Sequence, residues 1–166
     1  MKNMKKIVLP ILLTFISVFS VYSQKLIAYR DSVPDSYNFW VYVPETYDSV
    51  SATTPMILFL HGQSLCGTNL ANVRRYGPLD ALRRGRKIDA VIVAPQSPGP
   101  PWNPEKIWEV VEWAKERYPV DTNRFYVIGM SKGGYGTLDF SSVYYDKIAA
   151  AMALCGGSNA KSYCGL

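Results

Sequence analysis

The stretch from Tyr126 to Thr137, YVIGMSKGGYGT, decides the fold class. Its first half is apolar, as expected of a strand that is buried on both faces of a sheet. Its second half is rich in glycine and surrounds a single serine, Ser131. We predict a strand over Phe125–Gly129, a turn at Ser131 and a helix from Gly134. A strand that enters a helix through such a turn is typical of α/β proteins with a parallel sheet.

Other segments continue this alternation of strand and helix. Two short apolar runs, Met56–Leu60 and Ala90–Ala94, are bounded by turn residues and predict two more buried strands. Tyr37–Val43 is rich in aromatic and β-branched residues and predicts a strand near a sheet edge. Ala149–Leu154 predicts a last strand. We therefore expect an α/β fold with a mainly parallel sheet and flanking helices.

One helix is predicted between the second buried run and Ser131. Asn103 is suited to cap its start and Pro104 to its first turn, and Pro119 ends it. Its apolar residues recur at helical spacing and form one stripe, made of Ile107, Val110, Val111, Ala114 and Tyr118.

The turn itself matches the pattern G-x-S-x-G, formed by Gly129, Ser131 and Gly133, with Gly134 as a further glycine. In this pattern the serine occupies a strained turn, and the glycines avoid side chains that would collide there. The serine hydroxyl then points outward, and the backbone N–H of Lys132 points to where an oxyanion would develop. This pattern predicts that Ser131 is a nucleophile. The alternative is a solvated serine in a glycine-rich turn.

A second turn follows the strand Met56–Leu60. It opens with His61 and Gly62, and the backbone N–H of Gln63 is the candidate for a second oxyanion donor, with Gly62 allowing close approach. His61 is the only histidine of the chain. It precedes the serine, whereas a nucleophile turn of this type is followed by its acid and then its histidine. We therefore expect His61 to orient the oxyanion loop by a hydrogen bond and not to act as the catalytic base.

From about Tyr37 to Leu154 the chain resembles α/β-hydrolase esterases of the prolyl-oligopeptidase-like kind. These include exported feruloyl and acetyl-xylan esterases and polyhydroxybutyrate-depolymerase-like proteins. The residues that carry the likeness are Leu60-His-Gly62, Ala94-Pro95, Trp102-Asn-Pro104, Tyr118-Pro-Val-Asp121, Asn123-Arg124 and Gly129–Thr137. The resemblance implies the α/β-hydrolase fold, Ser131 as nucleophile, and Lys132 and Gln63 as oxyanion donors. It also implies a small-molecule or polysaccharide ester as substrate and no cofactor.

The chain departs from this family in two respects. Lys132 stands where the family more often has Met, which places a cation beside the serine. No carboxylate side chain follows Asp146 and no histidine follows His61, so the triad acid and histidine are missing from this sequence. Asp139 and Asp146 are interpreted as surface residues. We therefore expect a fold truncated after the strand that follows the nucleophile helix; the alternatives are an inactive, ligand-binding relic or a site completed by a partner chain.

The N-terminus has the pattern of an export signal. A basic start, MKNMKK, precedes the apolar run Ile7–Tyr22, and Ser23 is a small residue suited to cleavage before Gln24. The run is too short and too interrupted for a stable membrane span. We expect a signal peptide over residues 1–23, one hydrolase domain over residues 24–166, and a secreted or periplasmic protein.

Charge and cysteine content limit the possible functions further. Three of the 18 basic residues lie in residues 1–23, so the rest of the chain has 15 basic and 13 acidic residues. The resulting net charge of +2 is too weak to predict nucleic-acid binding. The cysteines, Cys66, Cys155 and Cys164, lack metal-ligand spacing. Their odd number suggests one disulfide and one free thiol, with the pairing open.

Overall fold

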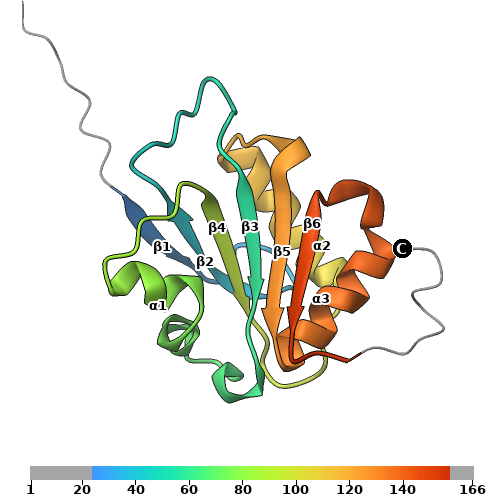
Figure 1. Cartoon of the computed structure of the whole chain (residues 1–166). Coiled ribbons are helices and arrows are strands. Elements are labelled where there is room, and N and C mark those ends of the chain that lie inside the picture. The colour runs from blue at the N-terminus through green and yellow to red at the C-terminus, as the bar shows by residue number, and fades with distance from the viewer. Residues whose placement is uncertain (1–23, 158–166) are drawn as a thin grey trace, which may run out of the picture.

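The computed structural model describes residues 24–157, which form a sheet with helices on both faces (Figure 1). The strands are β1 (Lys25–Tyr29), β2 (Asn38–Val43), β3 (Met56–Leu60), β4 (Val91–Gln96), β5 (Phe125–Met130) and β6 (Ala150–Leu154). They lie in the order β1-β2-β4-β3-β5-β6. β2 is antiparallel to β1 and β4, and the remaining pairs are parallel. The predicted α/β fold with a mainly parallel sheet is confirmed.

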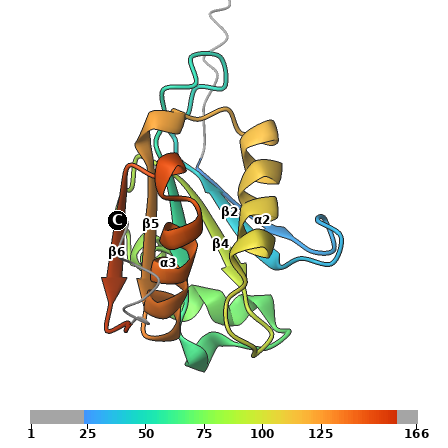
Figure 2. The same cartoon turned by 90° about the vertical axis from the view of Figure 1, so that its right-hand side faces the viewer.

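The helices α2 (Pro104–Arg117) and α3 (Lys132–Val143) cover one face of the sheet, and α1 (Pro78–Arg83) lies on the other (Figures 1 and 2). Short 3-10 helices complete the connections: η1 (Gln63–Leu65), η2 (Leu70–Arg75), η3 (Thr122–Arg124) and η4 (Tyr145–Lys147). Each face of the sheet has its own apolar cluster. The larger cluster packs β-strand residues against α2 and α3, and the smaller one packs them against α1 and η2.

The helix α2 begins and ends as the sequence predicts. The Asn103 side chain accepts a 2.8 Å hydrogen bond from the Lys106 backbone N–H and so caps the helix. Tyr118, just before Pro119, is its C-cap. The stripe residues of the helix proper are all fully buried: Ile107, Val110, Val111 and Ala114. This apolar face attaches α2 to the sheet.

Besides the short helix α1, which the sequence does not predict, two parts of the fold differ from the prediction. β1 was not predicted; it pairs with β2, so that β2 lies inside the sheet and β1 forms its edge. α3 begins at Lys132 instead of Gly134, which makes Ser131 the N-cap of the helix. The second difference places Ser131 directly at the positive end of the helix dipole.

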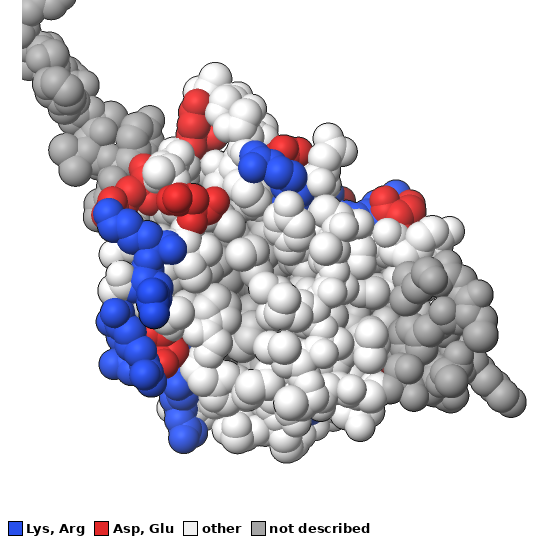
Figure 3. All heavy atoms as spheres, in the orientation of Figure 1, with Lys and Arg blue, Asp and Glu red and all other residues white. Residues whose placement is uncertain are grey.

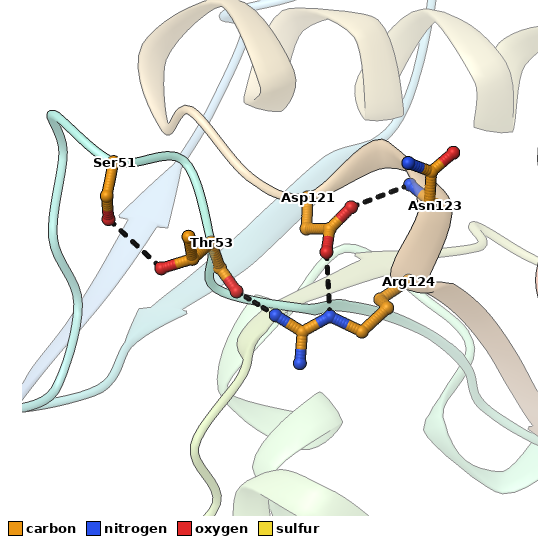
Figure 4. A network of polar contacts seen from close by, with 5 residues as sticks. All are labelled: Ser51, Thr53, Asp121, Asn123 and Arg124. Carbon is orange, nitrogen blue, oxygen red and sulfur yellow. Dashed lines mark hydrogen bonds and ion pairs between the residues drawn. The ribbon is translucent and has the colours of Figure 1, made fainter.

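A polar network holds the segments that lead into β3 and β5 (Figure 4). Asp121 accepts hydrogen bonds from the Asn123 backbone N–H and, at 2.8 Å, from Arg124 Nε. Arg124 also donates a hydrogen bond to the carbonyl of Thr53, just before β3. The network therefore ties the start of β5 to the start of β3.

The carboxyl ends of three parallel strands meet at one edge of the sheet. His61 follows β3, Ser97 follows β4 and Ser131 follows β5. Because Leu60 pairs with Gly129, the turns after β3 and β5 lie side by side. Open parallel sheets bind their ligands outside this edge.

Among residues 24–157, no helix is long and apolar enough to cross a membrane. The predicted signal peptide and Cys164 lie outside the described residues. Cys66 and Cys155 are free thiols in the described part of the chain.

Candidate active site

Ser131 adopts a backbone conformation that residues other than glycine rarely adopt. Its φ is 55° and its ψ is −118°. Its N–H donates a 2.7 Å hydrogen bond to the carbonyl of Leu154, and its carbonyl accepts one of 3.1 Å from the Tyr135 N–H. The turn between β5 and α3 therefore holds Ser131 in a strained conformation with positive φ, as is common at functional sites. Its side chain is exposed.

The glycines around Ser131 are required by the close approach of backbone segments. A Cβ atom on Gly129 would lie 2.0 Å from the carbonyl oxygen of Gly133. A Cβ atom on Gly133 would lie 1.8 Å from the carbonyl oxygen of Leu60 at the end of β3. Since real Cβ atoms never approach so closely, any side chain at these positions would displace the turn.

A pocket of about 480 Å³ opens beside Ser131, and it brings Ser131, Lys132 and Gln63 together. Lys132 is the first residue of α3, and Gln63 is the first residue of η1. Backbone N–H groups at the first positions of a helix have no partner within that helix. We expect the two N–H groups to converge on the oxygen of a bound carbonyl group.

Gly62 brings the turn after β3 into contact with the turn at Ser131. A Cβ atom on Gly62 would lie 3.1 Å from the carbonyl oxygen of Met130 and 3.4 Å from Cβ of Ser131. The Gly62 N–H donates a 2.8 Å hydrogen bond to the hydroxyl of Tyr76, which holds the turn from its other side. A residue with a side chain would push Gln63 away from Ser131.

His61 is completely buried and both of its ring nitrogens are used. Nδ1 donates a 2.8 Å hydrogen bond to the carbonyl of Gly62, and Nε2 accepts one of 3.1 Å from the Ser97 N–H. Burial lowers the pKa of His61 to about 4, although the hydrogen bond to the Gly62 carbonyl acts to raise this pKa. His61 is therefore neutral, links the loops after β3 and β4, and is not placed to accept a proton from Ser131.

The carboxylates of the C-terminal half lie in two different places. Asp139, on α3, is exposed and lines the same pocket as Ser131. Asp146 is paired with Lys147 at 2.7 Å and lines a different cavity, together with Met56 at the start of β3. Within residues 24–157, the Ser131 hydroxyl has no hydrogen bond to a histidine or carboxylate. No group of three or more potential metal ligands occurs in this part of the chain either.

Two aromatic residues of the pocket were not predicted. Trp102 is buried against Gly136, where an added Cβ atom would lie 2.5 Å from its ring. Tyr135 is 53% exposed and lies on α3. The helical spacing of Ser131, Tyr135 and Asp139, each four residues from the next, could have placed all three on one face of α3.

Neither a family model nor a curated protein matches the chain. Solved structures do match it. An acetyl xylan esterase from Aspergillus awamori is 20% identical with a TM-score of 0.64, over 86% of this chain and 55% of that one. An S-formylglutathione hydrolase from Staphylococcus aureus is 21% identical with a TM-score of 0.62, over 87% and 61%. The feruloyl esterase module from Clostridium thermocellum, solved with sinapinate, is 16% identical with a TM-score of 0.62, over 82% and 56%.

These similarities show that the chain has the fold of the α/β-hydrolases. The matches cover most of this chain but only 55% to 61% of these three proteins, so it spans little more than half of their length.

Proposed function

We propose that this chain is a serine hydrolase of carboxylic esters with Ser131 as its nucleophile. The observation that carries the proposal is the strained conformation of Ser131, at the N-terminus of α3 and beside a pocket. The glycines at positions 129 and 133 are needed for this turn, because a Cβ atom at either position would collide with the surrounding backbone. The fold shared with two esterases and an S-formylglutathione hydrolase supports the proposal.

In the proposed reaction the Ser131 hydroxyl attacks the carbonyl carbon of the ester. The negative charge that develops on the carbonyl oxygen is stabilised by the backbone N–H groups of Gln63 and Lys132 and by the positive end of α3. The alcohol then leaves with a proton, and water hydrolyses the acyl-serine. Each step requires a base that takes up a proton and returns it.

That base is not His61, because its Nε2 is occupied by Ser97 and its ring is buried. His61 is also the only histidine of the 166 residues. Full activity therefore requires a histidine from a further segment or a partner chain. Without it, only the residual acceleration from the oxyanion donors and substrate binding is left, roughly 10³–10⁴-fold over water.

The substrate that we favour is an ester with an aromatic or a small acyl group, such as those on plant polysaccharides. Tyr135 supplies exposed aromatic surface beside Ser131, the largely buried Trp102 lines the same pocket, and aromatic rings pack well on such surface. We further propose export, because the expected signal peptide would deliver the protein to polysaccharide outside the cell.

The test is the hydrolysis of an activated aryl ester by the 166-residue chain, with and without imidazole as an external base. Without imidazole we expect only the residual rate, several powers of ten below that of a complete triad, and poor labelling by a fluorophosphonate. Imidazole should raise the rate of the wild type more than that of Ser131→Ala, because only the wild type has a hydroxyl to activate. Equal rates for the two proteins under both conditions would contradict Ser131 as nucleophile.

A ligand-binding protein without turnover is the second candidate. The absence of a histidine or carboxylate bonded to Ser131 within residues 24–157 favours it. Binding of an aromatic acid such as ferulate that is equally strong in wild type and Ser131→Ala, together with no effect of imidazole, would support this candidate over the first.

A further inference from the structure

The side chain of Lys132 extends into two loops beside the pocket. Its Nζ donates hydrogen bonds to the Gly99 carbonyl at 2.8 Å and to Ser97 Oγ at 2.9 Å, both in the loop after β4. It also lies 3.1 Å from Sγ of Cys66, directly after η1. An ammonium group has three N–H donors, and three acceptors surround this one. The ammonium is therefore engaged by the protein and is not aimed at a ligand.

The loop after β4 forms one wall of the pocket. Gly99 and Trp102 line the pocket together with Ser131. On the side of β3 this loop is already held, because the Ser97 N–H donates to Nε2 of His61 and the Trp102 indole N–H donates to the His61 carbonyl at 3.3 Å. Lys132 supplies a link from the same loop to the turn at Ser131.

We propose that Lys132 is a positioning residue of the ester site, which fastens the loop Ser97–Trp102 to the nucleophile turn and so fixes the width of the pocket. The effect of Lys132 on substrates rests on the proposed function. The attachment of the loop by Lys132 does not depend on ester hydrolysis. Hydrogen bonds to charged groups are stronger than those between neutral groups, so one ammonium can hold the loop where a Met side chain cannot.

The consequence for substrates concerns the acyl group. Without the ammonium, Ser97 and Gly99 lose their hydrogen bonds to α3, and the part of the wall before Trp102 becomes more mobile. An aromatic acyl group packs against this wall, whereas an acetyl group needs little of it. Lys132→Met should therefore lower turnover of an aromatic acyl ester about tenfold and change that of an acetyl ester far less.

The first experiment measures amide hydrogen exchange in Lys132→Met, residue by residue. We expect exchange at Ser97 and Gly99 to be about tenfold faster than in the wild type, with the amides of α2 unchanged. The matched control is Lys147→Met, which removes an exposed lysine paired with Asp146 and should leave Ser97 and Gly99 unchanged. Unchanged exchange at Ser97 and Gly99 in Lys132→Met, or equal acceleration throughout the protein, would overturn the proposal.

A further variant and a second experiment keep the test decisive. If Lys132→Met does not fold, Lys132→Gln removes the charge and shortens the side chain, and it should accelerate exchange at Ser97 and Gly99 in the same direction. The second experiment compares nitrophenyl acetate with nitrophenyl ferulate in the presence of imidazole. A ratio of the two rates unaltered by Lys132→Met would overturn the effect on the acyl group. Rates that do not depend on Ser131 would instead contradict the proposed function, and the exchange data would still decide the role of Lys132.

Discussion

At the scale of single residues, His61 shows how burial determines a chemical role. Its ring is fully buried, donates to the Gly62 carbonyl and accepts from the Ser97 N–H. This arrangement fits only the neutral ring, because a protonated Nε2 could not accept a hydrogen bond. The position of His61 before Ser131 in the chain predicts that it is not the base. Its bond to Ser97 could not be predicted, because it joins residues brought together by sheet order alone.

The lowered pKa of His61 predicts a dependence of stability on pH. In the unfolded chain His61 takes up a proton near its ordinary pKa of 6.5, whereas in the folded protein it does so only at about 4. The unfolded state therefore binds more protons as the pH falls from 6.5 to 4, and the free energy of unfolding should decrease by about 3 kcal/mol over this interval.

Urea unfolding at pH 6.5 and 5.0 tests this dependence. Carboxylates change their protonation little between these two pH values. Most of the slope of the unfolding free energy against pH should therefore come from His61. In His61→Gln the slope should be lost, although the variant is less stable at both pH values. An equal slope in wild type and His61→Gln would contradict the assignment.

Gly133 gives a steric prediction at the same scale. In Gly133→Ala the added Cβ atom would lie 1.8 Å from the backbone oxygen of Leu60, which has no freedom to move away. We expect a loss of about 3 kcal/mol in stability and loss of any reactivity that depends on Ser131. Gly85→Ala is the control: its Cβ would meet open space, and its φ of 83° should cost only about 1 kcal/mol. Equal effects of the two substitutions would contradict the steric explanation.

At the scale of elements, the sequence predicts those helices and strands that have a clear cap, apolar run or apolar stripe, and it does not predict those that lack one. The cap at Asn103 and the apolar stripe predict α2 closely, and the apolar runs predict β3, β4 and β5. α1 was not predicted, because it spans only Pro78–Arg83 and has no complete stripe. β1 lies next to the expected cleavage site and is stabilised by pairing with β2, which local sequence does not reveal.

Arg124 connects two elements and carries the next prediction. It donates to Asp121 and to the carbonyl of Thr53, and its hydrogen bond lowers the pKa of Asp121. Arg124→Met should decrease the free energy of unfolding by about 1 kcal/mol, because both bonds are partly exposed. The exposed Arg75 provides the control variant Arg75→Met, which should change stability very little. Urea unfolding measures both, and equal midpoints would show that the network in Figure 4 does not hold the two strands.

At the scale of the whole molecule, the two faces of the sheet are covered unequally. On the face that bears α1, Phe59 pairs in register with Ile128, and Ile128 pairs with Met152. Phe59 is buried, Ile128 is half-buried and Met152 is 55% exposed. The side chains on this face therefore become more exposed to solvent from β3 to β6. Figure 3 shows the same face as a broad area without charged residues. Leu154, in the last strand, is also 44% exposed.

An uncharged apolar area of this kind drives association in water. We expect the 166-residue chain to associate as its concentration rises, since β6 is the edge strand of the sheet formed within residues 24–157 and Met152 on it is exposed. Met152→Lys places a charge in this area and should weaken association at least tenfold, because burial of a Met side chain contributes about 1.5–3 kcal/mol. Val50→Lys is the matched control: Val50 is 91% exposed in the loop between β2 and β3, away from this face. Sedimentation velocity over a range of concentrations distinguishes the two. If Val50→Lys weakened association as much as Met152→Lys, net charge would be the cause; only a specific effect of Met152→Lys identifies the uncovered sheet face as the surface that associates.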